Sequence, residues 1–198
     1  MCIRDSITTG EGGALSSSNK SFFARSKKFA RQGLVRNAKE FVTDTRDPWH
    51  QEVQEFGLNY RMTDFQCALG VSQLERVNNF KAKRDKIRKR YIDNLSVSTE
   101  IEIIKEKDYA DPFWHLFPIL LPMGKKKKVF KDLQNVGIQA NVNYLPAYKH
   151  PVFGTSAKSV RHKNAEEFYL RELSLPFHTK LKLKQVDFIC EVLINSLK

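Results

Sequence analysis

Two short motifs contain residues of the types that bind anions. The first, ITTGEGG at residues 7–13, gathers three glycines behind a short β-rich piece. A phosphate-cradling loop needs the pattern GxxxxGK[ST] with a helix after it. No lysine follows Gly13 and the next residues have no clear helical pattern, so we expect a tight chain reversal here, which glycine tolerates.

The second motif, GLNYRMTD at residues 57–64, directly precedes a predicted helix. Backbone N–H groups at a helix start attract anions, so Asn59 as an amide donor and Arg61 as a cationic fork are candidates to bind phosphate or carboxylate. The alternative is structural: Asn59 closes a turn, and Arg61 pairs with an acid such as Asp64. Spacing alone leaves both interpretations open.

The remaining candidate residues carry weaker signals. His115 lies in the apolar run FWHLFPILL, where a lone histidine is more often a core residue than a catalyst. Tyr144, near two prolines, either lines a pocket or packs. The other histidines have no partners at ligand spacing, and the three cysteines form no CxxC pair, so neither a metal site nor a disulfide framework is indicated.

Hydrophobic periodicity predicts the elements that position these residues. A basic helix is expected over residues 21–33. Thr63, with Gln66 three positions later, is expected to cap a long helix over residues 63–98. A small α+β unit is expected to follow, with strands at 101–104, 113–121 and 138–144 and helices at 125–136, 164–173 and 183–197.

Composition narrows the class of protein. The chain has 198 residues, 41% of them hydrophobic, and a formal net charge of +12. It is long enough to bury a core, and it has neither a run of 18 apolar residues nor a signal-peptide pattern at its start. These features favour a globular protein of the reducing cytoplasm without a membrane span.

The excess of positive charge also raises the possibility of nucleic-acid binding. Residues 81–90 (KAKRDKIRKR) hold seven basic residues, and Lys125–Lys128 add four. No nucleic-acid-binding motif accompanies them. Because basic runs usually form solvated faces, we regard a nucleic-acid-binding module as the less favoured alternative.

Taken together, the motifs resemble those of a known family. ITTGEGGAL, PWHQEVQEFGLNYRMTDFQCALGVSQLERV, FWHLFPILL, GIQANVNYLPAYKHPVF and NAEEFYLRELSLPF follow the order seen in the DegT/DnrJ/EryC1/StrS sugar aminotransferases. The resemblance runs from about Ser6 to the C-terminus. It is strongest to the branch that acts on UDP-4-keto-6-deoxy-N-acetylhexosamines on the way to pseudaminic acid.

The resemblance implies an α/β fold, the C-terminal part of a fold-type-I transferase dependent on pyridoxal 5'-phosphate. Residues 1–62 would be the end of the large αβα domain with an interface loop, 63–98 a connecting helix, and 99–198 a small C-terminal α+β domain. The implied reaction passes the amino group of glutamate to the C4 ketone of a UDP-linked sugar, with the cofactor as electron sink.

The resemblance also implies roles for the candidate residues. Asn59 matches the asparagine that reaches the cofactor phosphate of a dimer partner, and Arg61 lies in the same cross-subunit loop, facing cofactor phosphate or substrate. His115 and Tyr144 would border the sugar-nucleotide site. A homodimer is therefore expected.

One position departs from the family pattern. The lysine that forms the Schiff base stands two positions before the isoleucine of ITTGEGG, and here that position is Asp5. Aspartate cannot form a Schiff base, and residues 1–5 do not resemble the family. From the sequence we therefore expect a chain cut short before its cofactor domain and inactive as written, or alternatively a non-catalytic binding protein derived from the family.

Overall fold

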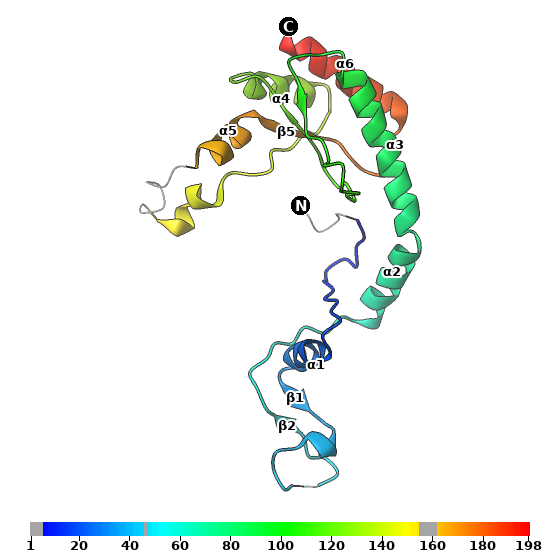
Figure 1. Ribbon diagram of the computed structural model, residues 1–198, viewed down its shortest axis with the longest axis vertical. Helices are drawn as coiled ribbons and strands as arrows, with labels where there is room; N and C mark the ends of the chain where they lie inside the picture. Colours follow the sequence, from blue (N-terminus) through cyan, green and yellow to red (C-terminus); the bar gives the residue numbers. More distant parts are fainter. Residues whose placement is uncertain (1–5, 46, 155–161) are drawn as a thin grey trace. The chain divides into compact units, whose positions relative to one another are not determined.

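The computed structural model describes residues 6–45, 47–154 and 162–198, and the chain divides into two compact units, Met1–Glu75 and Arg76–Lys198 (Figure 1). Each unit is described by itself. Asp5 lies outside the described residues, so the lysine position stays a sequence prediction.

The first unit contains helix α1 (Lys20–Phe29), a two-stranded antiparallel sheet of β1 (Leu34–Val35) and β2 (Glu52–Val53), the 3-10 helix η2 (Ala38–Glu40), and helix α2 (Asp64–Glu75). Asn19 caps α1, because its Oδ1 accepts a hydrogen bond from the backbone N–H of Phe22 over 3.1 Å. Neither α1 nor α2 has a buried residue.

A backbone junction in this unit joins residues 29–33 to residues 57–60. The N–H groups of Leu58 and Tyr60 donate to the carbonyls of Phe29 and Ala30 over 2.8 and 2.9 Å. The segments approach so closely that a Cβ on Gly57 would lie 2.5 Å from the Phe29 oxygen. Gly57 is therefore required by contact between backbones rather than by a turn.

Helix α2 begins as the sequence predicts. Thr63 and Gln66 form a capping box: the Gln66 N–H donates to Thr63 Oγ1 over 3.4 Å, and the Thr63 N–H donates to Gln66 Oε1 over 2.9 Å. The expectation of one continuous helix over 63–98 is wrong, however. Arg76, at φ −102° and ψ 0°, ends the run, and a second helix, α3 (Val77–Leu95), starts after it.

The second unit is built on a three-stranded antiparallel sheet in the order β3 (Glu102–Ile103), β4 (Phe117–Leu120), β5 (Glu172–Leu175). The predicted strand over 138–144 is absent from it. Asn141 makes a single bridge to Ser174, but the next donor, the N–H of Asn143, is taken by the Glu172 side chain over 2.8 Å, so pairing stops there.

Around the sheet lie α3, α4 (Lys126–Asn135), α5 (Lys163–Arg171) and α6 (Leu183–Leu197), with the 3-10 helices η3 (Ala147–Lys149) and η4 (Pro151–Phe153). Helix α6 packs against both α3 and α4 (Figure 1). The hydrophobic core of the unit contains side chains from these three helices and from the sheet. In it, Tyr91 of α3 stacks on Phe117 of β4 at 4.6 Å between ring centroids, and the Tyr91 hydroxyl donates to the Pro176 carbonyl over 2.9 Å.

Several basic residues of the two clusters, 81–90 and Lys125–Lys128, make contacts within the second unit. In the 81–90 run, Arg84 and Arg88 are buried rather than solvated, and Arg88 bonds to Glu106. Lys125 and Lys128 donate to the carbonyls of Leu197 and Ser196 at the end of α6. Cations at this position neutralise the negative end of a helix dipole, so these lysines have a structural task within the unit.

Candidate functional site

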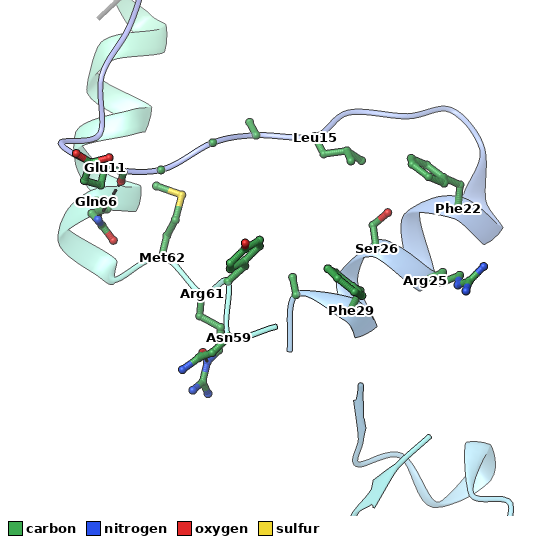
Figure 2. A pocket seen from close by; sticks show the side chains of 15 residues that line it. Glu11, Leu15, Phe22, Arg25, Ser26, Phe29, Asn59, Arg61, Met62 and Gln66 are labelled. Carbon is green, nitrogen blue, oxygen red and sulfur yellow. Dashed lines mark hydrogen bonds between the residues drawn. The ribbon is translucent and has the colours of Figure 1, made fainter. Parts of the chain in front are cut away.

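The ITTGEGG and GLNYRMTD motifs of the sequence meet in the first unit. A cavity of about 1010 Å³ is lined by the 11–15 loop, one face of α1, and residues 59–62 with Gln66 (Figure 2). The Gln66 amide donates to the Glu11 carbonyl over 2.9 Å, which ties the glycine loop to the start of α2. A Cβ on Gly12 would lie 2.6 Å from Thr9 Oγ1, so glycine is needed for this fold of the loop.

Asn59 and Arg61 lie side by side at one edge of this cavity (Figure 2). The Nε of Arg61 donates to Oδ1 of Asn59 over 2.6 Å. This bond occupies the amide oxygen, so the NH₂ group of Asn59 is the end left for an acceptor. Within the described ranges Arg61 forms no ion pair with Asp64, and the predicted alternative pairing is therefore not the one found.

The other side of the junction carries a second cavity, of about 330 Å³. Its lining residues are Arg31, Gln32, Leu34, Arg36 and Arg61. Arg31 forms an antiparallel bridge with Asn59, which places it beside the 59–61 segment. Sequence reasoning missed Arg31 and Arg36, because nothing in their local pattern shows that the fold brings them to Arg61.

The irregular segment between β1 and β2 is held by Glu52. Its carboxylate accepts hydrogen bonds from the N–H groups of Val42 and Thr43 over 2.8 and 3.0 Å, from Thr43 Oγ1 over 2.5 Å, and from the Gln54 amide over 2.8 Å. Burial raises the pKa of Glu52, but these hydrogen bonds outweigh it and hold the pKa well below its usual range. Glu52 thus fixes the loop that leads into the junction.

His115 and Tyr144 both lie in the second unit, whereas Asn59 and Arg61 lie in the first. His115 is half-buried just before β4. Tyr144 is half exposed and follows Asn143, whose side chain donates to Ser174 Oγ over 2.9 Å. The buried Glu172 accepts from both Asn143 and Ser174, and it therefore anchors the segment that presents Tyr144.

Two other classes of site are not found in the part of the chain that the structure describes. No group of three or more His, Cys, Asp or Glu side chains there is arranged to hold a metal ion. Among the same residues, no helix is long and apolar enough to cross a bilayer.

Comparison with known protein families identifies the class to which the chain belongs. Residues 4–194 match the model of the DegT/DnrJ/EryC1/StrS aminotransferase family, and the chain belongs to this family. The family and the fold class predicted from the sequence are thereby confirmed.

Two relatives are similar to the chain over nearly its whole length. The chain is 33% identical over 195 residues to the UDP-4-amino-4,6-dideoxy-N-acetyl-beta-L-altrosamine transaminase of Campylobacter jejuni, covering 97% of this chain and 50% of the relative. The solved structure of Helicobacter pylori PseC, an aminotransferase involved in the biosynthesis of pseudoaminic acid, is similar with a TM-score of 0.84 and 29% identity over 96% of this chain and 50% of that one.

A third comparison concerns the cofactor. A putative sugar aminotransferase of Streptococcus pneumoniae, solved in its PMP form, shares the fold with a TM-score of 0.82 and 23% identity, over 96% of this chain and 48% of that one. Aminotransferases of the family use pyridoxal phosphate, as the sequence predicts. The chain spans about half the length of the curated relatives it matches.

The described residues fit the phosphate end of this cofactor. Asn59 offers an amide donor and Arg61 a guanidinium, both exposed and held by one hydrogen bond. Among the described residues, no acidic side chain lines the cavity formed by Arg31, Arg36 and Arg61. Hydrogen-bond donors and positive charge placed together favour the binding of a phosphate group.

Proposed function

We propose that the chain works as part of a pyridoxal-phosphate-dependent aminotransferase that passes the amino group of glutamate to a UDP-linked 4-keto-6-deoxy-N-acetylhexosamine. The observation that carries the proposal is the Asn59–Arg61 pair, joined by a 2.6 Å hydrogen bond next to the glycine loop. The similarity to the Campylobacter jejuni transaminase supports the choice of sugar.

In this proposal Asn59 and Arg61 bind rather than react. The Asn59 amide donates to the cofactor phosphate, and the Arg61 guanidinium supplies positive charge to that phosphate or to a substrate anion. When bound, the cofactor supplies the electron sink for amino transfer. The GEGG loop, tied to Gln66, holds the backbone that closes this end of the cavity.

We further propose that Asn59 serves the site of a second subunit. The first unit exposes large apolar side chains that a partner surface would cover. They include Phe22, Phe23, Trp49, Phe56 and Phe65. Burial of such a surface favours association. A homodimer would supply it and would place the 57–64 loop at the interface.

His115 and Tyr144 are proposed to border the sugar nucleotide. Tyr144 is half exposed and follows Asn143, whose side chain is anchored on Ser174. His115 is half-buried at the start of β4. Both would act by contact with the substrate.

Asp5 at the lysine position leads to a further proposal: the chain by itself does not catalyse amino transfer. Only an amine can make the covalent bond to the cofactor aldehyde on which transamination depends. Activity then requires a polypeptide that supplies a lysine at this position.

The test is a fusion protein that joins the first half of the Campylobacter jejuni transaminase, including its lysine, to residues 6–198. We expect the fusion protein, with pyridoxal phosphate, glutamate and the UDP-ketosugar, to form 2-oxoglutarate and the aminated sugar, detected by mass spectrometry. The 198-residue chain should form neither. A folded fusion protein that binds the cofactor yet transfers no amino group would count against the function and favour a non-catalytic binding role.

A further inference from the structure

Three arginines from three separate segments surround one cavity in the first unit. Arg31 follows α1, Arg36 follows β1, and Arg61 belongs to the 57–64 motif. The other two lining residues, Gln32 and Leu34, are uncharged, so no carboxylate of the described residues lines the cavity. Its volume of about 330 Å³ lies at the lower end of the range for small-molecule sites, roughly 300–1,000 Å³.

The backbone beneath these arginines is tightly fixed. The Gln32 N–H donates to the Leu58 carbonyl over 3.1 Å, and Gln32 has a positive φ of 64°. A Cβ on Gly33 would lie 1.7 Å from the Glu55 oxygen, so this close approach requires glycine. The arginines therefore project from a rigid junction, and a ligand would find the site largely formed.

The contacts of the arginines leave their charge unneutralised. Arg36 Nε donates to Gln51 Oε1 over 3.0 Å, and Arg61 Nε donates to Asn59 Oδ1 over 2.6 Å. Both acceptors are neutral amides, which orient a guanidinium without cancelling its charge. In the described ranges, none of the three arginines takes part in an ion pair. An anion at the centre would relieve the repulsion among three like charges.

We propose that this cavity binds a diphosphate, with Arg31 and Arg36 as ligands beside Arg61. Guanidinium groups bind phosphate oxygens in pairs through their parallel N–H bonds, and three of them match the charge on two linked phosphates better than that on one. Identification of this diphosphate as that of a nucleotide sugar rests on the proposed function. The anion site itself rests only on the geometry of the first unit.

Calorimetric titration of the 198-residue chain with inorganic pyrophosphate and with UDP tests the proposal. Both should bind saturably, and affinity should fall as salt is raised. Replacement of both arginines, R31Q/R36Q, should weaken binding by about tenfold for each arginine lost. The control K20Q/K27Q removes the same charge from exposed positions of α1 and should leave affinity within about twofold.

The single variant R36K distinguishes the contribution of the guanidinium geometry of Arg36 from that of its positive charge. It keeps the positive charge but loses the guanidinium fork, so its affinity should lie between those of the wild type and R36Q. Circular dichroism spectra that match the wild type confirm that each variant is folded. If R31Q/R36Q does not fold, the comparison of pyrophosphate affinity between R36Q and R36K still tests whether Arg36 binds the anion.

Two results would overturn the proposal. The first is absence of saturable pyrophosphate binding, or binding that R31Q/R36Q leaves unchanged. The second is tighter binding of pyridoxal phosphate or inorganic phosphate than of pyrophosphate and UDP, if that binding is lost in R31Q/R36Q. This result would assign the cavity to a single phosphate group. None of these titrations measures amino transfer, so they remain interpretable if the fusion protein is inactive.

Discussion

The guanidinium Nε of Arg61 donates a hydrogen bond to Oδ1 of Asn59 over 2.6 Å. The two residues are separated in sequence only by Tyr60, and the bond turns both side chains to the same edge of the junction (Figure 2). It orients the Asn59 amide so that its NH₂ group is the end offered to an anion.

Removal of Arg61 should therefore weaken cofactor binding for two reasons: a positive charge is lost, and the Asn59 amide is no longer oriented. In the fusion protein, Arg61→Gln should raise the dissociation constant for pyridoxamine phosphate by about tenfold or more, measured by fluorescence titration. Arg25→Gln is the matched control, since Arg25 lines the same cavity but pairs with Glu55. Equal effects of the two variants would show that Arg61 acts only through net charge.

Gly57 should be intolerant of any side chain. A Cβ there would lie 2.5 Å from the Phe29 oxygen and 2.6 Å from the Gly33 nitrogen, so Gly57→Ala must push the two segments apart. Hydrogen exchange of the Leu58 and Tyr60 amides should accelerate by at least about tenfold. Gly13→Ala, where no atom beyond the adjacent residues lies within 4 Å of the added Cβ, should leave these amides unchanged. Unchanged exchange in Gly57→Ala would contradict the close approach.

The two units should respond differently to loss of a leucine. Leu133 of α4 is fully buried, so Leu133→Ala should lower the free energy of unfolding of its unit by about 2–5 kcal/mol in urea titrations. Leu74 of α2 is 58% exposed, and Leu74→Ala should cost less than about 1 kcal/mol in the monomeric chain. A large loss for Leu74→Ala would mean that a partner already covers α2 in solution.

Glu172 should give the second unit a characteristic pH dependence. Burial raises the pKa of Glu172 above its ordinary value of 4.5, although Asn143, Ser174 and Lys126 act in the opposite direction. The folded state then holds this proton more tightly than the unfolded state, so the stability from this group falls as pH rises above 4.5. Urea titrations at a series of pH values above 4.5 should show that the free energy of unfolding depends less on pH in Glu172→Gln than in the wild type.

The control for Glu172 is Glu167→Gln, which changes the half-exposed partner of Arg171 on α5. That variant should keep the wild-type slope of stability against pH. Identical slopes for the wild type and Glu172→Gln would exclude the buried carboxyl as the cause.

Local signals in the sequence predicted some elements well. The Thr63–Gln66 capping box is where the pattern placed it, and α6 spans Leu183–Leu197 as its apolar face indicated. These features depend on residues within a few positions of each other, so the sequence contains them directly.

Elements set by distant contacts were missed. The strand β5 has the alternating sequence ELSL, but four residues directly after a helix are too short a run to identify, and only the fold shows that all four are buried. The segment 138–144 also alternates, yet it makes only one bridge. The cavity formed by Arg31, Arg36 and Arg61 depends on the junction between 29–33 and 57–60. No local pattern encodes that contact between segments.

The claim that Asn59 completes the site of a partner subunit is tested most directly by mixed dimers. Two forms of the fusion protein are prepared, one without the Schiff-base lysine and one with Asn59→Ala, each expected to be nearly inactive alone. If Asn59 acts across the interface, co-expression should restore roughly a quarter of the wild-type rate of amino transfer, since half of the dimers are mixed and each has one complete site. Mixed dimers that form but remain as inactive as either parent would contradict the account.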